Sequence, residues 1–416
     1  MRKDIRLLLS LILLVFFIGC DDAVLPDLPE MEDSMDVDTF EIGDEDEIKD
    51  AEENQDEDAV EDEYAEEPQI KASHVIVAEV GGYDVPMSGK VFYAENENLN
   101  DFKEISVENG MGSPTGADLN LAVWNDGFVS IGRHDSSSLY FFGNDFGFNN
   151  EIKIKSDTYI NMQDVVYNPF KDEFIISALS SNKLFLLKND FVNVEVSELE
   201  ISGNELASPA KMRVIGSRLF VALQNLDERN LPDKGEIAIV SLEDYSVKLV
   251  SLPKKNPTGK IEYNTAFDTK HIYFVATGEW QKRDGALLQM DLETYETKVV
   301  LSESEEENNI LDGDFVDVTI ADNGEFYIIF SNNSSKWENN LLKYLPTDGK
   351  VSKIDSNINA FAANPIDFSP FTGRIYYFVD IESDTYLKYF DTKTAESETV
   401  LLDFGPAALR VKLEIE

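Results

Sequence analysis

The stretch Val165–Ile176, VVYNPFKDEFII, decides the fold, and it returns near the C-terminus as Ile366–Tyr377, IDFSPFTGRIYY. In both copies, two runs rich in β-branched and aromatic residues flank a short turn that contains proline. This pattern predicts an antiparallel β-hairpin. A third copy, Ile320–Tyr327, carries the Asn-Gly dipeptide that is typical of tight hairpin turns. Looser copies of the same hairpin occupy residues 121–131, 212–223 and 266–276.

A second hairpin alternates with the first one along the chain. The triplet Asn-Asp-Phe begins at Asn100, Asn144 and Asn189, at steps of 44 and 45 residues, and it separates apolar runs. We interpret the triplet as the turn of this second hairpin. Two hairpins make four strands, and a repeat of about 45–54 residues with four strands is typical of a β-propeller blade.

The number of repeats predicts the architecture. Six full units begin near Asp118, Asp164, Pro209, Ile261, Phe315 and Pro365. Before them stands a unit with only three expected strands, at 74–80, 90–94 and 102–107. The alternating segment Ala408–Ile415 supplies the missing strand. We therefore predict an all-β, seven-bladed propeller over residues 69–416, whose first blade is closed by the C-terminal strand. Repeat counting alone leaves six or eight blades open.

The N-terminal region predicts export and a lipid anchor. Basic residues precede the apolar run Leu7–Gly19, which is too short to cross a bilayer comfortably and ends at Cys20, the only cysteine. Residues 1–19 resemble a bacterial lipoprotein signal peptide. The resemblance implies lipidation at Cys20 and attachment to a membrane of the cell envelope, for which we favour the outer membrane or cell surface over the inner membrane.

The composition limits the partners. Residues 21–68 contain 24 acidic residues and one base, Lys49, within a chain of net charge −46. Such a segment buries too little apolar surface to fold, so residues 20–68 are predicted to be a disordered acidic tether. Phosphate backbones repel a chain of this charge, which argues against nucleic acid as a partner. With no cysteine besides the anchor, disulfides are excluded. We expect a monomer.

Two units also show a family likeness. Arg218–Leu242 and His271–Thr294 each contain a strand followed by a second strand that ends in an acidic turn. Both resemble the surface-layer-type propeller repeats named after a Tyr-Val-Thr-Asn motif, although this string itself is absent here. The resemblance implies an exported propeller and supports fold and location more than chemistry.

Loops between the second and third strands of blades 4 to 6 are the first candidate site. The loops of blades 5 and 6 place tryptophan beside bases that are scarce elsewhere, and the blade 4 loop carries further bases. Exposed tryptophan with polar neighbours suits a sugar or a protein partner. The predicted ligand-binding residues are Arg229, Trp280, Lys282, Arg283, Lys336 and Trp337. This site predicts a binding or scaffold module that recognises an envelope protein or glycan.

The central channel is the second candidate site. Acidic residues precede or begin the first strands of several blades, and converging carboxylates could bind calcium, as they do in lactone-hydrolysing propellers. The predicted metal ligands are Asp118, Asp164, Glu262 and Asp317. This alternative predicts a calcium-dependent hydrolase or lyase. No Gly-x-Ser-x-Gly elbow or phosphate loop is present, no catalytic residue is predicted, and the sequence favours a protein without enzymatic activity and without a required cofactor.

Overall fold

The computed structural model describes residues 70–79, 87–108, 110–111, 118–133, 137–154, 160–190, 194–304, 309–332, 338–360, 362–382, 384–402 and 405–415. The predicted signal peptide, lipidated Cys20 and acidic tether lie outside these residues, as do Lys336 and Trp337. Within the described ranges, no helix is long and apolar enough to cross a membrane.

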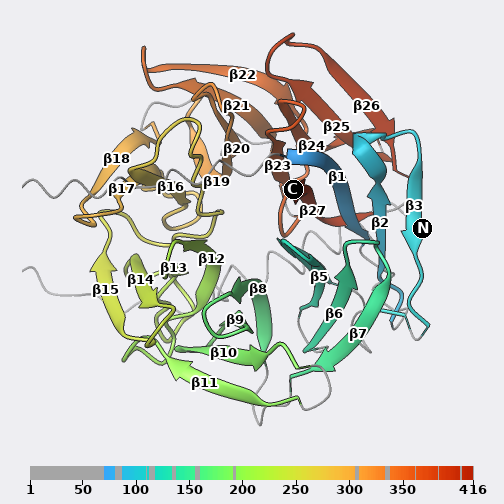
Figure 1. Cartoon of the computed structure of the whole chain (residues 1–416). Helices are drawn as coiled ribbons and strands as arrows, with labels where there is room; N and C mark the ends of the chain where they lie inside the picture. The colour runs from blue at the N-terminus through green and yellow to red at the C-terminus, as the bar shows by residue number, and fades with distance from the viewer. Residues whose placement is uncertain are drawn as a thin grey trace, which may run out of the picture. The chain divides into compact units, whose positions relative to one another are not determined.

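Seven antiparallel sheets form a ring around a central channel, so the predicted seven-bladed propeller is confirmed (Figure 1). Blades are numbered along the chain, and their strands are given from the channel outward. Blades 1 to 3 consist of β27 (Pro406–Ile415), β1 (Ile70–Glu79), β2 (Lys90–Ala94) and β3 (Phe102–Ile105); β4 (Leu119–Trp124), β5 (Gly127–Gly132), β6 (Ser138–Gly143) and β7 (Phe148–Lys153); and β8 (Asn161–Asn168), β9 (Glu173–Leu179), β10 (Lys183–Lys188) and β11 (Val196–Glu200).

Blades 4 to 7 continue around the ring. They consist of β12 (Pro209–Ile215), β13 (Arg218–Leu223), β14 (Glu236–Ser241) and β15 (Val247–Ser251); β16 (His271–Ala276), β17 (Ala286–Asp291) and β18 (Thr297–Ser302); β19 (Gly313–Ile320), β20 (Phe326–Asn332), β21 (Asn339–Leu345) and β22 (Lys350–Ser356); and β23 (Ile366–Ser369), β24 (Arg374–Ile381), β25 (Asp384–Asp391) and β26 (Ser397–Leu401). A short 3-10 helix, η1 (Glu95–Glu97), follows β2.

Blade 5 departs from the predicted pattern at its inner edge. The strand expected near Ile261 is replaced by two isolated bridges, Pro257 to Ala276 and Glu262 to Tyr273. Pro257 has no N–H to donate to a ladder. Gly259 lies so close to β16 that a Cβ atom there would meet the Val275 side chain at 2.3 Å. The segment therefore follows the sheet closely without forming a regular strand.

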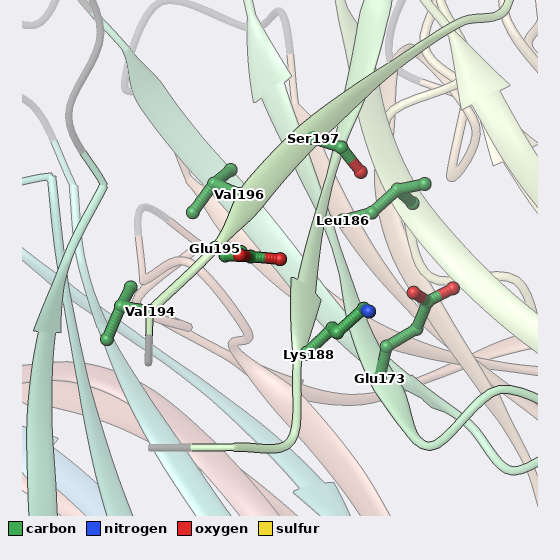
Figure 2. A pocket seen from close by; sticks show the side chains of 7 residues that line it. All are labelled: Glu173, Leu186, Lys188, Val194, Glu195, Val196 and Ser197. Atoms are coloured by element: carbon green, nitrogen blue, oxygen red, sulfur yellow. The ribbon is translucent and has the colours of Figure 1, made fainter. Parts of the chain in front are cut away.

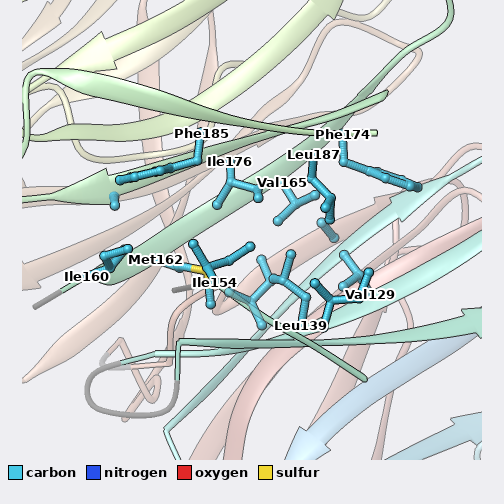
Figure 3. Close-up of a cluster of buried hydrophobic side chains, with 14 of the residues drawn as sticks. Val129, Leu139, Ile154, Ile160, Met162, Val165, Phe174, Ile176, Phe185 and Leu187 are labelled. Carbon is cyan, nitrogen blue, oxygen red and sulfur yellow. The ribbon is translucent and has the colours of Figure 1, made fainter. Parts of the chain in front are cut away.

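The core lies between the blades. Each of the seven buried apolar clusters joins neighbouring sheets, because alternate residues of every inner and middle strand point to opposite blades. Figure 3 shows the cluster between blades 2 and 3, where Leu139 and Val129 of blade 2 face Phe174 and Ile176 of blade 3. The ring is thus held by repeated sheet-on-sheet packing.

The C-terminal strand closes the ring, as predicted. β27 pairs with β1 in antiparallel register, with Val77 opposite Leu409 and Val75 opposite Val411. These side chains are buried together with Phe378 of blade 7, so β27 contributes both a ladder and a core face. Strands from the two ends of the described chain therefore complete a single blade.

A buried carboxylate reinforces this junction. Glu97 of η1 accepts hydrogen bonds from the hydroxyls of Ser73 in blade 1 and of Ser369, Thr372 and Tyr376 in blade 7. Four hydroxyl donors satisfy the carboxylate, and the Arg374 guanidinium of blade 7 interacts with its charge. This network is a polar clasp between the first and last blades.

Candidate functional site: recognition loops and central channel

The channel-lining segment of each blade contains a polar residue that is followed by an apolar one. These residues are Asn120, Asp164, Lys211, Lys260, Asp317, Asp367 and Arg410. All except Asp367 are buried, and Asp367 is largely buried. Four of the seven are a base or an amide, so the channel is lined by mixed charges and is less acidic than the sequence interpretation suggested.

The channel carboxylates are engaged by backbone N–H groups of neighbouring blades. Asp164 accepts from Met212 of blade 4 at 3.0 Å, and Asp317 accepts from Lys260 of blade 5 at 2.8 Å. Asp367 accepts from Val411 of β27 at 2.8 Å. Because the innermost segments of different blades are not paired in one ladder, these carboxylates supply the hydrogen bonds that join them.

Two lysines cross between blades within the channel. Lys211 donates to the Ala363 carbonyl at 2.9 Å and to Asn364 Oδ1 at 2.7 Å, and both acceptors belong to the segment leading into blade 7. Burial lowers the pKa of Lys211 to about 7, and the Asp164 carboxylate opposes this shift. Lys260 lies 3.1 Å from Asp367. Burial works against its charge, but the surrounding carboxylates hold the pKa of Lys260 above its ordinary value.

The four predicted calcium ligands do not converge on one point. Asp118 pairs with Arg133 at 3.6 Å, and Glu262 lies 3.4 Å from the Lys260 ammonium. Asp164 and Asp317 accept the backbone hydrogen bonds described above. Among the residues that the structure describes, no group of three or more His, Cys, Asp or Glu side chains is placed to hold a metal ion. The calcium site stays a prediction.

The β16–β17 loop, residues 277–285, carries the predicted ligand-binding residues of blade 5. Three carboxylates hold its backbone: Asp284 accepts from Glu279 at 2.8 Å, Asp314 from Gln281 at 2.8 Å and Glu303 from Gly285 at 2.7 Å. Glu303 directly follows β18 of blade 5, and Asp314 lies in β19, the inner strand of blade 6. The loop is therefore fixed from the neighbouring blade as well as from within.

Two glycines make this loop possible. Gly278 has a φ of +75°, which side chains with a Cβ rarely adopt. A Cβ on Gly285 would meet the Glu303 carboxylate at 2.3 Å and the backbone oxygens of Thr277 and Ala276 at 2.6 and 2.8 Å, so this close approach requires glycine. Asn256 adds a hydrogen bond of 2.9 Å to the Gly278 carbonyl.

The supporting acids are buried, and their ionisation is suppressed. Burial raises the pKa of Glu303 to about 8, although the N–H groups of Gly285 and Phe315 favour its charged form. Burial also raises the pKa of Asp314 to about 7, and its Oδ2 atom has no hydrogen-bond partner. Neither acid is among the predicted site residues, because nothing in the local sequence predicts their burial.

The predicted bases of these loops are placed in different ways. Lys282 is 61% exposed and lies 3.8 Å from Glu279. Arg283 is bound to the buried Asp312 at 2.8 Å, which assigns it a supporting role. Arg229, in the β13–β14 loop, is 77% exposed, and its guanidinium donates two hydrogen bonds to Asp227 of the same loop. Trp280 is partly exposed. We call the β13–β14 and β16–β17 loops the recognition loops.

The comparisons with known proteins support the architecture. The chain is a β-propeller. It is similar to a proposed 6-phosphogluconolactonase from Bacteroides fragilis, with a TM-score of 0.57 and 11% identity over 82% of this chain and 98% of that chain. A protein from Lactobacillus plantarum gives a TM-score of 0.55 at 11% identity over 82% of this chain and 99% of that chain.

A second proposed 6-phosphogluconolactonase, from Bacteroides uniformis, gives a TM-score of 0.54 at 10% identity over 82% of this chain and 99% of that chain. No family model and no curated relative matches the sequence. At such low identities these similarities show the fold alone, and function has to be argued from the site.

Proposed function

We propose that this chain is an exported, lipid-anchored propeller that binds an envelope protein or glycan through its recognition loops. The observation that carries this proposal is the bracing of the β16–β17 loop by Asp284, Glu303 and Asp314. A loop held in one shape loses little conformational entropy when it binds a ligand, which favours affinity.

The chemistry of the loop side chains agrees with this role. Trp280 carries a partly exposed indole, and the Lys282 side chain is 61% exposed. Stacking on a sugar ring or insertion into a protein pocket would use the indole, while the ammonium would pair with an acidic group. The predicted anchor at Cys20 and the acidic tether would hold this surface away from a membrane.

The test compares binding by variants of the two ends of the propeller. The full chain and its Trp280→Ala and Lys282→Ala variants are titrated with soluble peptidoglycan fragments and lipopolysaccharide, and are used to capture envelope proteins. Phe371→Ala is the matched control, because Phe371 is 46% exposed in the β23–β24 turn at the opposite end of the blades. Loss of binding only in the loop variants supports the proposal, and equal binding by all four proteins contradicts it.

The alternative, a calcium-dependent hydrolase or lyase, requires a metal in the channel. Two of the structural neighbours are described as proposed lactonases, but no cluster of acids among the described residues of this chain supports a metal site. Metal analysis of the purified chain distinguishes the calcium-dependent enzyme from the binding module. One tightly bound calcium that disappears in an Asp164→Asn, Asp317→Asn double variant would favour the enzyme.

A further inference from the structure

The tip of the β16–β17 loop is held in a strained shape. Gln281 and Arg283 have φ values of +66° and +57°, in the left-handed region that residues other than glycine rarely adopt. Both are held from the neighbouring blade. The Gln281 N–H donates to Asp314 at 2.8 Å, and Arg283 Nε donates to Asp312 at 2.8 Å. Because release of the strain favours opening, the closed shape of the tip depends on these contacts.

Asp314 provides the contact whose strength depends on pH. Its side chain is fully buried, and its Oδ1 atom accepts from the Gln281 N–H, whereas its Oδ2 atom has no hydrogen-bond partner. An ionised carboxylate is stable in a buried site only when several donors or a cation offset its desolvation, so this environment favours the neutral acid. Burial accordingly raises the pKa of Asp314 to about 7, and the Gln281 N–H opposes the shift.

The acids around Asp314 add to this preference. Asp284 of the loop raises the pKa of Asp314 further, because two nearby carboxylates repel each other when both are charged. The charge of Asp314 likewise raises the pKa of Glu303. The nearby ammonium of Lys255 lies 3.8 Å from Asp284 and 3.4 Å from Glu279, where it offsets the charge of the loop's own acids. Ionisation of Asp314 would therefore add a negative charge to a group that is already acidic.

We propose that Asp314 makes the β16–β17 loop pH-dependent: the neutral acid keeps the tip closed, and ionisation releases it. In the open loop the carboxylate reaches water and regains its ordinary pKa of about 4. The closed loop is then fully favoured below about pH 4. Above this pH the opening constant rises by up to tenfold per pH unit, and it levels off above about pH 7. The effect on ligands rests on the proposed function: a rise in pH should weaken binding through this loop.

Hydrogen exchange of the loop amides tests this proposal without a ligand. The full chain is purified in mild detergent and exchanged at pH 5.5, 6.5 and 7.5. Protection factors, corrected for the intrinsic pH dependence of exchange, are obtained for peptides that cover residues 278–285 and, as an internal reference, β14 of blade 4. We expect the protection of the loop to fall at least tenfold from pH 5.5 to 7.5, while that of β14 changes less than twofold.

Asp314→Asn identifies the group that responds to pH. The substitution keeps the oxygen that accepts from Gln281 and removes the charge, so the fall in protection should shrink to less than threefold. Glu303 still titrates in this variant. It accepts from the N–H groups of both Gly285 and Phe315, at the base of the loop, and stays in place when the tip opens.

Glu173→Gln is the matched control, because Glu173 is another buried acid whose pKa is raised by burial. Figure 2 shows Glu173 among the residues that line a surface cavity on blade 3, two blades away from the loop. This variant should keep the full pH dependence of the unaltered chain. Constant protection of the loop, an equal fall in β14, an equal fall in Asp314→Asn, or loss of the pH dependence in Glu173→Gln would each overturn the proposal. None of these results involves a ligand, so the failure of this proposal and that of the proposed function are distinguishable.

Discussion

Replacing Leu409 by alanine tests how much the C-terminal strand stabilises the ring. Leu409 is fully buried in β27, opposite Val77 of β1, and it packs in the cluster that joins blades 1 and 7. The substitution removes the apolar contacts of the side chain and leaves a cavity between these blades. Substitutions of this kind cost about 2–5 kcal/mol, and we take about 3 kcal/mol for this site.

The expected shift in melting temperature follows from the size of the propeller. A folded unit of roughly 350 residues has an unfolding entropy of about 0.7 kcal/mol/K, so a loss of about 3 kcal/mol lowers Tm by about 4 °C. Differential scanning calorimetry measures this shift. Urea denaturation provides a second measurement, in which the midpoint falls while the dependence on urea is unchanged.

Leu401→Ala is the matched control for this prediction. Leu401 has the same side chain, but it is 49% exposed on the outer strand β26, so its replacement should cost no more than about 0.5 kcal/mol. A chain that ends at Gly405 lacks β27 altogether and should melt below both variants. Equal melting temperatures for Leu409→Ala and Leu401→Ala would refute closure by the C-terminal strand.

Three further predictions concern buried polar groups. Glu303 and Asp314, with pKa values raised to about 8 and about 7, bind protons more tightly in the folded chain than in the unfolded one. This tighter proton binding stabilises the folded chain fully below about pH 4, and the stabilisation is lost as the pH rises through 7 and 8. The free energy of unfolding falls by at most about 1.4 kcal/mol per pH unit for each group. Urea melts at pH 5.5 and 8.5 should therefore differ less for the Glu303→Gln, Asp314→Asn double variant, and an unchanged difference would contradict the assignment. Lys211, whose pKa is lowered to about 7, has the opposite effect on the pH dependence of stability. The free energy of unfolding should rise between pH 7 and 9.5 by more in the unaltered chain than in Lys211→Met. Parallel plots of this free energy against pH for the two chains would contradict the lowered pKa of Lys211. Glu97→Ala leaves four hydroxyls without their acceptor and should lower stability by roughly 3 kcal/mol in calorimetry, whereas a melt like that of the unaltered chain would show that the clasp is unimportant.

The fold could be predicted because its pattern is local and repeated. Lys90–Ala94 was expected as a strand and is β2 with the same bounds, and the Asn-Asp-Phe slot at Asn144 is the turn between β6 and β7. The closing strand was inferred because one unit lacked a first strand and the C-terminus had a strand to spare. The inner edge of blade 5 was only partly predictable, because Pro257 is visible in the sequence whereas the close approach of Gly259 to Val275 is not.

The residues of the candidate site were less predictable, because their roles depend on burial and on contacts with residues far away in the sequence. Glu97 finds its partners 24 to 279 residues away in sequence, and nothing near it indicates four hydroxyl donors. The basic residues of the channel could have been predicted from the repeat pattern. Lys211, Lys260 and Arg410 occupy the polar position that Asp164 occupies in its own blade, so an alignment of the innermost segments would have predicted mixed charges there.

Binding measured on the two ends of the propeller tests the central claim most directly. The full chain and its Trp280→Ala and Phe371→Ala variants are titrated with the same envelope glycans and captured envelope proteins. We predict that Trp280→Ala weakens binding at least tenfold while Phe371→Ala, at the opposite end of the blades, leaves it unchanged. Equal affinities for all three proteins, with unchanged melting temperatures, would contradict the assignment of the recognition loops as the binding surface.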